Sequence, residues 1–517
     1  MMAGNHHVPS IHRATLCRFA LAACGAALAC PSLAHAQTTC PDRARVTRQI
    51  EIGPGSPEFF AAVDAGDRFG VGVAEIGDVD GDGVADLAIG APNVDDGGPQ
   101  VGSVWIVFLA ADGRTKSTAR IGPVGTGGLA GPLSSDAFFG VGVDGLGDLD
   151  GDGVPDIIVG ASGDDGAGGT NRGAVFVLFL NRDGTVKAES KFGMNMGGFR
   201  SQMSENSRFG TSVATLGDLD GNGTLEVAVG HPNEDIAPGQ TDDGAAWVVS
   251  LNSSGTVERE VLIGVAQSGF GGAVLAGDEF GNSVGGGEDI DGDGIPDMVV
   301  GARRDNVGGE NAGAAYVVFL NADGTVRDET KITSSFGGLP PGLLDPGEEF
   351  GSGVDTLPDV NGDGVPEIAV GVWLDTDGRG ITGTMWVLFL GRDGRVRDRQ
   401  KIDENFLPGL LGPNGRFGWG VSAGSRDDEG NVRVLVGAST DSTFSLDEAG
   451  TTWMLSLESC ERCVADVDDD GELTLFDYLA FQILFDAGSP LVDFDGDGSL
   501  TLFDFLAFQN AFDAGCP

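Results

Sequence analysis

Hydrophobic positions in this chain fall into short runs that recur in the same order along most of its length. In the second recurrence an apolar run at residues 139–143 is followed by an acidic loop, a second apolar run at 157–159 and a continuous apolar run at 173–180. A more polar run at 185–191 comes last, after the turn sequence at 181–184. Short apolar runs between turns predict strands, and a run that is apolar on both faces predicts a strand covered on both sides. Each recurrence therefore predicts a four-stranded sheet stacked between two others.

The recurrences number six, and each opens on a Phe-Gly pair. The sixth lacks its last strand, and residues 46–52 look like that strand but belong to no unit of their own. A ring in which the N-terminal strand completes the C-terminal sheet uses every segment, whereas an open solenoid leaves two exposed edges. The pattern therefore predicts an all-β ring of six blades, a β-propeller. The six phenylalanines are Phe69, Phe139, Phe209, Phe280, Phe350 and Phe417.

The loop after each opening run carries an acidic nonapeptide in the first five units, at intervals of about 70 residues. Positions 1, 3, 5 and 9 offer carboxylate or amide oxygens, position 7 offers a backbone carbonyl, and a glycine at position 6 permits a sharp turn. Such a flexible cage of oxygens suits calcium better than zinc or octahedral magnesium. An Asp-Gly hairpin with solvated carboxylates is the alternative, but four carboxylates without a cation would repel one another.

We therefore predict five calcium sites in the propeller. Their expected ligands are Asp78, Asp80, Asp82, Val84 and Asp86; Asp148, Asp150, Asp152, Val154 and Asp156; Asp218, Asp220, Asn222, Thr224 and Glu226; Asp289, Asp291, Asp293, Ile295 and Asp297; and Asp359, Asn361, Asp363, Val365 and Glu367. In the sixth unit position 9 is Arg433, so a positively charged side chain stands where the other units have a carboxylate ligand. We expect Arg433 to substitute for an ion there, so that this unit binds none.

After Cys463 the acidic spacing changes. Residues 466–477 and 493–504 each fit a twelve-residue EF-hand loop that ends in Asp instead of Glu, and each is followed by an apolar stretch with the length of a helix. The two copies are about 27 residues apart, which leaves no room for the helix that normally precedes such a loop. Two further calcium ions are expected, bound by Asp466, Asp468, Asp470, Glu472, Asp477, Asp493, Asp495, Asp497, Ser499 and Asp504.

The N-terminus has the features of an export signal. Arg13 and Arg18 precede an apolar run at residues 19–30, and a small-x-small sequence ends at Ala36. A buried N-terminal helix and a lipoprotein signal at Cys24 are the alternatives. Beyond this run no stretch approaches the ~20 apolar residues of a membrane span. We therefore expect a signal peptide at 1–36 and a mature protein that is secreted, extracellular or held at the cell surface.

Composition narrows the classes of function. The 517 residues are 41% hydrophobic, enough for a large core, and their formal net charge is −48. This excess of negative charge argues against nucleic acid as a partner. Removal of residues 1–36 leaves His231 as the only histidine, at a turn position where other units have alanine, and we expect it to be structural. No catalytic triad or isolated pair of carboxylates remains, so the sequence does not predict an enzyme.

Four cysteines remain after cleavage, which allows three disulfide pairings in an oxidising compartment. We favour Cys40 with Cys460, because ring closure would bring the two ends of the propeller together, and Cys463 with Cys516. Free buried thiols are the alternative. A metal site at Cys460 and Cys463 is not supported, since no second pair of ligands lies nearby.

The Phe-Gly pairs, the acidic loops and Gly90-Ala91-Pro92 resemble the FG-GAP repeats of the integrin α-chain β-propeller family, over roughly residues 45–457. Propellers of that family have seven blades, which makes seven the alternative to six. The C-terminal duplicate resembles a bacterial dockerin, which implies a cohesin-like or surface-anchoring partner. Tyr478, Phe481, Phe505 and Phe508 are candidates for that contact, although core packing is favoured for at least half of them.

These resemblances imply three segments: a signal peptide at 1–36, an FG-GAP β-propeller at 37–460 and a small α-helical dockerin-like domain with paired calcium loops at 461–517. The expected function is recognition or adhesion of a protein or polysaccharide ligand, with the C-terminal domain as tether. In the resembling family, ligands meet the face opposite the calcium loops. A dockerin-borne polysaccharide-degrading enzyme and a purely structural surface component are the alternatives. The loops expected on the ligand face lie at 122–137, 193–208, 232–243 and 333–349.

Overall fold

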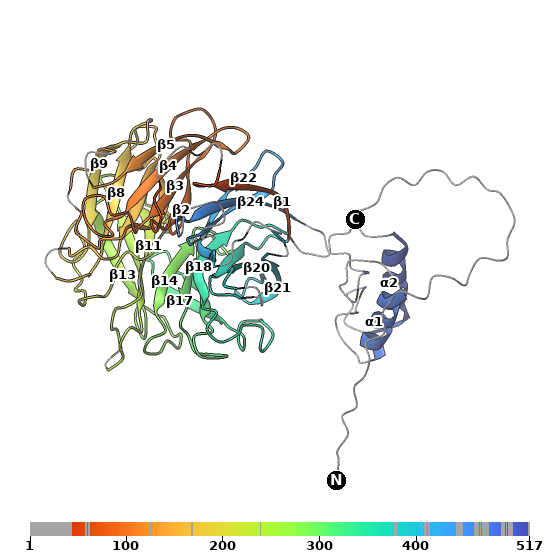
Figure 1. The fold of residues 1–517 in the computed structure, drawn as a ribbon. Helices are drawn as coiled ribbons and strands as arrows, with labels where there is room; N and C mark the ends of the chain where they lie inside the picture. Colours follow the sequence, from red (N-terminus) through yellow and green to blue (C-terminus); the bar gives the residue numbers. More distant parts are fainter. Residues whose placement is uncertain are drawn as a thin grey trace, which may run out of the picture.

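A computed structural model of the chain contains six four-stranded antiparallel sheets and, near the C-terminus, two helices (Figure 1). It describes residues 44–459 apart from 57–58, 60–62, 124–126, 132, 167–168, 238, 377–379, 405, 408–410, 412–413 and 441–447, and in the C-terminal region residues 465, 467, 475–486, 492, 494 and 500–514. The expected disulfides and the export signal lie outside the described residues.

Each sheet follows the strand order predicted from the hydrophobic runs. Blade 1 consists of β2 (Val73–Gly77), β3 (Asp86–Ala91), β4 (Ser103–Leu109) and β5 (Thr115–Ile121), and blade 2 of β6 (Phe139–Gly147), β7 (Asp156–Ala161), β8 (Ala174–Leu180) and β9 (Val186–Phe192). Blade 3 consists of β10 (Val213–Gly217), β11 (Leu225–His231), β12 (Ala245–Leu251) and β13 (Val257–Ile263), and blade 4 of β14 (Phe280–Gly286), β15 (Met298–Ala302), β16 (Ala314–Leu320) and β17 (Val326–Ile332). Blade 5 consists of β18 (Phe350–Leu357), β19 (Glu367–Val372), β20 (Thr384–Leu390) and β21 (Val396–Ile402), and blade 6 of β22 (Phe417–Arg426), β23 (Val432–Ala438), β24 (Thr451–Ser459) and β1 (Ala44–Ile52).

The N-terminal strand completes the last sheet. β1 pairs antiparallel with β24, so the first strand of the chain lies beside the last, as the red and blue strands show in Figure 1. Blade 1 packs against blade 6 through β2 and β22, and the amide of Phe69 donates to the carbonyl of Ala449 at 2.8 Å. The ring closure predicted from the sequence is therefore confirmed. The described residues form six blades, and the seven-blade alternative finds no support among them.

The hydrophobic core lies between neighbouring blades. The third strand of blades 1 to 5 is buried along its whole length, as its apolar pattern on both faces predicts. The phenylalanine of each Phe-Gly pair is fully buried and fills the space between its own blade and the preceding one. Phe139, for example, packs with Ile106 of blade 1 and meets the ring of Phe176 edge-on at 5.4 Å. Six such interfaces hold the ring together.

Glycines permit the blades to approach this closely. A Cβ added to Gly90, the first residue of the Gly-Ala-Pro motif, would lie 1.8 Å from the carbonyl oxygen of Gly140, which belongs to the Phe-Gly pair of the next blade. The same approach recurs at the ring closure, where a Cβ on Gly437 would lie 1.8 Å from the oxygen of Gly70. The two recurring motifs therefore meet at each interface between blades.

The strand order also assigns the loops to two faces. The acidic loops and the turns between third and fourth strands lie on one face of the ring. The turns after the second strands and the connections between blades lie on the other, since successive strands are antiparallel. The loops predicted to contact a ligand are of these last two kinds, so they lie opposite the acidic loops.

The two C-terminal helices lie side by side (Figure 1). They are α1 (Leu475–Asp486) and α2 (Leu502–Ala514), at the two stretches predicted to be helical. Their shared core is aromatic: the rings of Phe481 and Phe508 stack with centroids 4.5 Å apart. Among the described residues, neither helix nor any other is both long and apolar enough for a membrane span.

The glycine contact between blades yields a testable prediction. Gly90→Ala should destabilise the protein by about 1–3 kcal/mol, because the methyl group would overlap backbone that cannot move without opening the interface. Chemical denaturation followed by tryptophan fluorescence would measure the loss. Gly264→Ala is the control: its φ lies outside the left-handed region, and the nearest atoms to an added Cβ are 3.5 Å away, an ordinary van der Waals distance. If both variants lose equal stability, the contact is not the cause.

Candidate metal centres

Each acidic loop is organised around its first aspartate. In blade 1 the amides of Gly81 and Gly83 donate to the carboxylate of Asp78 at 2.7 and 2.8 Å. Both glycines have φ in the left-handed region, at 81° and 91°, which a residue with a side chain rarely adopts. The loops of blades 4 and 5 repeat these bonds around Asp289 and Asp359. The short glycine-rich sequence therefore folds the loop tightly around position 1.

The carboxylate at position 9 is buried at the start of the second strand. Asp86 accepts hydrogen bonds from the amide of Val79, at 3.0 Å, and from that of Leu109 at the end of the third strand, at 2.9 Å. This carboxylate therefore ties the acidic loop to the sheet. The same arrangement with two amide donors holds Asp156 and Asp297, and at least one equivalent amide donates to Glu226 and Glu367.

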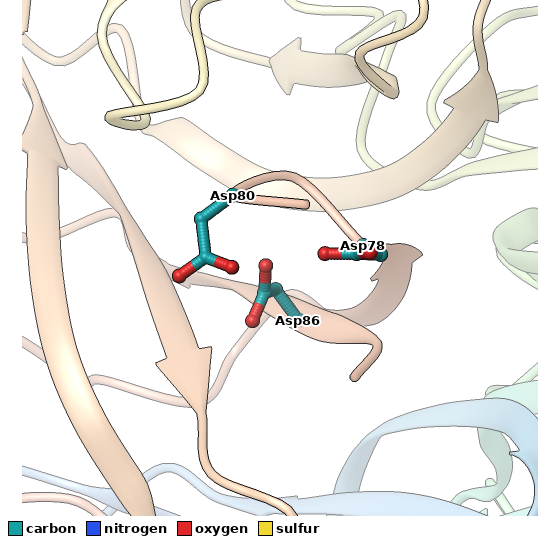
Figure 2. Close-up of side chains that lie close together, drawn as sticks. All are labelled: Asp78, Asp80 and Asp86. Carbon is teal, nitrogen blue, oxygen red and sulfur yellow. The ribbon is translucent and has the colours of Figure 1, made fainter. Parts of the chain in front are cut away.

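Four of the five loops bring three carboxylates together. Figure 2 shows those of Asp78, Asp80 and Asp86 turned toward a common point. Within each of the four groups, one oxygen from every residue lies within 4.8 Å of the others. The loop of blade 3 is not among them, and in blade 5 Asp363 at position 5 takes the place that Asn361 leaves at position 3. The groups are Asp78, Asp80 and Asp86; Asp148, Asp150 and Asp156; Asp289, Asp291 and Asp297; and Asp359, Asp363 and Glu367.

Burial makes the negative charge at position 9 costly. It raises the pKa of Asp86 and of Asp156 to about 6, that of Asp297 to about 7 and that of Glu367 to about 8. Glu367 Oε1 is also buried without a hydrogen-bond partner among the described residues. An ionised carboxylate in such a place needs a compensating charge. The oxygen donors, their number and this unmet acceptor all fit a hard divalent cation.

A basic residue on the fourth strand contacts the outer carboxylates of three loops. Lys116 Nζ lies 2.6 Å from both Asp80 and Asp82, and it lowers the pKa of Asp82. Lys187 bridges positions 3 and 5 of blade 2 in the same way, and Arg327 those of blade 4. These cations were not predicted from the sequence. Their signal was a basic residue directly after the first residue of the fourth strand.

Blades 3 and 5 lack this bridge. In blade 3 the equivalent position is Glu258, and Arg259 instead lies 3.5 Å from Glu226. In blade 5 Arg397 pairs with Asp393 of its own hairpin, at 2.8 Å. Both loops have an asparagine where the others have an aspartate, at position 5 in blade 3 and at position 3 in blade 5. The bridging cation therefore accompanies the loops of higher negative charge.

The sixth loop holds an ion pair that was not predicted from the sequence. Arg433 occupies the equivalent of position 9, and its guanidinium lies 3.5 Å from Ser425 Oγ at position 1 of the same loop and 3.4 Å from Glu75 of blade 1. The other oxygen of Glu75 accepts a hydrogen bond from the amide of Ser425 at 2.8 Å. Arg433 thus helps to close the ring between blades 6 and 1. Within the loop itself, Asp427 accepts from the backbone and side chain of Asn431.

The C-terminal loops are described only at their ends. Asp477 and Asp504, at position 12, are fully buried and accept from the amides of Val467 and Phe494 at position 2, at 2.8 and 2.9 Å. This resembles the bond between positions 9 and 2 in the propeller loops. The other predicted ligands of these two loops lie outside the described residues. They are Asp466, Asp468, Asp470, Glu472, Asp493, Asp495, Asp497 and Ser499.

The candidate aromatic contacts on the two helices belong to their core. Phe481 and Phe508 are buried, and Tyr478 and Phe505 pack against them. The preference for core packing is therefore confirmed. On the described parts of the two helices, the exposed large apolar residues are Leu479, Ile483, Leu502, Phe503 and Leu506.

His231 is structural, as predicted. Its ring is fully buried at the end of β11, and Trp247 Nε1 donates to its Nδ1 at 3.2 Å. Burial lowers its pKa to about 3, so the ring is neutral at physiological pH. A neutral imidazole out of reach of solvent cannot serve as a general base for a dissolved substrate.

Comparison with known proteins identifies the repeats. Four segments match the FG-GAP repeat family: residues 73–107, 139–178, 209–249 and 280–318. The chain is 30% identical over 177 residues to integrin alpha-5 of Xenopus laevis and 33% identical over 168 residues to integrin alpha-6 of Homo sapiens. Each match covers 32% of this chain, but only 15% and 13% of the relative. The chain therefore contains FG-GAP repeats homologous to part of integrin alpha chains.

The buried carboxylates predict an unusual response to pH. Their pKa values in the folded protein exceed the ordinary 3.8 or 4.5, so the folded state without metal binds protons more tightly than the unfolded chain. Stability should therefore fall as pH rises from about 5 to about 8, where the cost of burying the charge is fully present. Calorimetry in the presence of a chelator would show a falling melting temperature.

Asp86→Asn is the matched variant for this measurement. It has no charge to bury, so part of the slope with pH should disappear, while its single amide oxygen can accept only one of the two backbone hydrogen bonds that Asp86 accepts. A melting temperature that rises with pH in chelator, or an identical slope in the variant, would contradict the assignment.

Proposed function

We propose that this chain is an exported, calcium-binding β-propeller that serves in recognition or adhesion, with its C-terminal helical pair as a tether. The observation that carries the proposal is the fivefold repetition of one acidic loop on one face of a closed ring of FG-GAP repeats. The longer connections between blades lie on the opposite face.

Calcium is the cation that the loops fit best. The donors are carboxylate, amide and carbonyl oxygens, without the cysteine or histidine that zinc prefers. The loops are held by their own glycine amides, which positions the carboxylates before any ion arrives. The buried oxygen of Glu367 that has no hydrogen-bond partner is one acceptor an ion would satisfy. The two C-terminal loops would add two further sites.

A binding role is favoured over catalysis. The relatives are integrin alpha chains, the acidic clusters are accounted for by metal binding, and His231 is buried and neutral. A polysaccharide-degrading enzyme and a purely structural surface component remain the alternatives. The ligand of the propeller would be a protein or a polysaccharide.

The C-terminal pair has a surface suited to a tether. Five large apolar residues on α1 and α2 are exposed: Leu479, Ile483, Leu502, Phe503 and Leu506. Apolar side chains gathered on two adjacent helices favour a protein partner. A cohesin-like or surface-anchoring protein is the partner that the dockerin-like sequence implies.

Chelation tests the calcium sites. Extracellular sites bind calcium at roughly 10⁻⁴–10⁻³ M, so each would stabilise the fold by about 0.4–1.4 kcal/mol at millimolar calcium. Five together would contribute on the order of 2–7 kcal/mol, a large part of a domain's net stability. EDTA should therefore lower the melting temperature, and calcium, but not equimolar magnesium, should restore it. An unchanged melting temperature would refute a structural role for the ion.

The bridging lysines should weaken calcium binding. Lys187→Met should raise the affinity of the blade 2 loop about three- to tenfold, because it frees Asp150 and Asp152 and removes a positive charge close to the ion. Lys191→Met is the matched control, since Lys191 lies on the same strand but pairs with Asp164 at 2.7 Å. Competition with a chromophoric chelator would measure both. Equal affinities in the two variants would show that the bridge does not compete with the ion.

A screen separates the functional alternatives. The mature protein would be offered an array of glycans and extracellular proteins, with and without EDTA, and the same ligands would be assayed for cleavage. Capture without cleavage supports recognition, whereas the appearance of products would establish an enzyme.

A further inference from the structure

A cavity of about 600 Å³ lies at the centre of the ring. Its walls are residues of the first strands of all six blades, such as Val73 and Val143. At one end it is lined by residues that precede the Phe-Gly pairs or follow the second strands, on the face opposite the acidic loops. We call this end the channel mouth. Its volume is in the range of sites for small molecules or for the end of a chain-like ligand.

The residue before each Phe-Gly pair occupies an equivalent place around the channel mouth. All six have a left-handed backbone although none is glycine, so the fold imposes this conformation six times whatever the side chain. Only the side chain then distinguishes one position from the next. In order around the ring, the residues and their φ angles are Arg68 (58°), Phe138 (53°), Arg208 (61°), Glu279 (55°), Glu349 (58°) and Arg416 (55°).

The two acidic residues among these six, Glu279 and Glu349, already have positively charged partners. Glu279 lies 2.8 Å from Arg303 and 2.6 Å from Arg304. Glu349 accepts a hydrogen bond from Trp373 Nε1 at 2.8 Å and lies within 4.0 Å of the same two arginines. Blades 4 and 5 therefore present a closed network of ion pairs at the channel mouth.

The three basic residues among the six, Arg68, Arg208 and Arg416, have no comparable network of ion pairs among the described residues. Within the described part of the chain, no carboxylate forms an ion pair with Arg208 or Arg416, although Glu448 and Glu349 act on Arg416 from farther away. Arg68 reaches only Glu448, at 4.0 Å, and its Nε is buried without a hydrogen-bond partner among those residues. Burial, and then the charge of Arg68, lower the pKa of Arg416. Blades 6, 1 and 3 thus hold positive charge that an anion would neutralise.

The carboxylates deeper in the cavity, Asp144 and Asp355, form no ion pair with these arginines among the described residues. Asp144 accepts from the amide of Thr215 at 2.6 Å, and Asp355 from that of Ala423 at 2.8 Å, so both are committed to bonds between blades. Burial raises the pKa of Asp144 to about 6 and that of Asp355 to about 7. The arginines at the channel mouth keep their excess of charge.

In the order of the blades an aromatic residue comes between Arg68 and Arg208, two of the four arginines that line the cavity. Phe138 of blade 2 stands between Arg68 of blade 1 and Arg208 of blade 3, and the Arg208 guanidinium lies 5.8 Å from the centre of its ring. Asn93 and Asn233 line the same cavity, and the side-chain amide of Asn233 donates to Asp242 at 3.1 Å. Guanidinium groups bind carboxylates through paired hydrogen bonds, amides bind hydroxyls, and an aromatic ring can cover the apolar face of a sugar.

We propose that the channel mouth is a binding site for an acidic carbohydrate, whose carboxylate groups are held by Arg68 and Arg208 while a sugar ring packs on Phe138. A chain with net charge −48 repels anions at long range, so arginines that gather on one small surface with few close carboxylates among the described residues are a selective feature. The inference rests on the proposed recognition function and names its ligand class. The calcium ions on the opposite face do not take part in this contact.

The test uses the mature full chain at saturating calcium and a hexasaccharide that contains glucuronate. Calorimetry should show binding at least tenfold tighter than that of the same hexasaccharide after reduction of its carboxyl groups. Arg68→Ala and Arg208→Ala should each weaken the binding about tenfold or more. Arg114→Ala, in the hairpin of blade 1 on the face with the acidic loops, should leave it unchanged.

Two further measurements keep the outcomes distinct. Arg208→Lys keeps the charge but not the paired hydrogen bonds, so it should weaken binding less than Arg208→Ala does. The melting temperature of each variant shows whether it has folded. Equal binding of the reduced sugar, or tighter binding of a hexa-aspartate peptide, would overturn the proposal while recognition stands. Failure of the protein to capture any member of a broad glycan and protein array would remove the recognition function as well.

Discussion

The structure depends on one steric constraint: the backbones of neighbouring blades must come closer than any side chain permits. At the first interface Gly90 meets Gly140, and at the closure of the ring Gly437 meets Gly70. Because the blades approach this closely, each phenylalanine of a Phe-Gly pair is sealed between two sheets. The aromatic cores, the ring and the cavity at its centre all follow from that approach. A larger residue at any of these glycines would act on two blades at once.

Charge is distributed between the two faces of this ring. One face gathers the carboxylates of the acidic loops, and the buried member of each group makes the loop a site that needs a cation. The other face gathers arginines around a cavity, although basic residues are the minority in the chain. An ion bound on the first face would stiffen the loops between the first and second strands. The other face would then be free for contacts, on a scaffold that does not need to rearrange.

Much of the scaffold could be predicted because its determinants are local and repeated. The apolar run at 173–180 becomes β8, fully buried, and the isolated run at 46–52 becomes β1 in the last sheet. The acidic loops could be recognised for the same reason, since their ligands lie within nine residues. Lys116 was missed, because its contact with Asp80 joins residues 36 positions apart, and its place at the start of the fourth strand does not by itself show which loop it meets.

Contacts between blades were harder to predict. Arg433 was expected to take the place of an ion within its own loop, but its contact with Glu75, which is 358 residues away, was not predicted. The arginines of the channel mouth are also separated by whole blades, and only ring closure brings them around one cavity. The sequence by itself determined the strands, the number of blades and the acidic loops, because hydrophobic periodicity and turn residues act over a few positions. Only the tertiary structure decided which charges meet across blades, because that depends on the order and curvature of the closed ring.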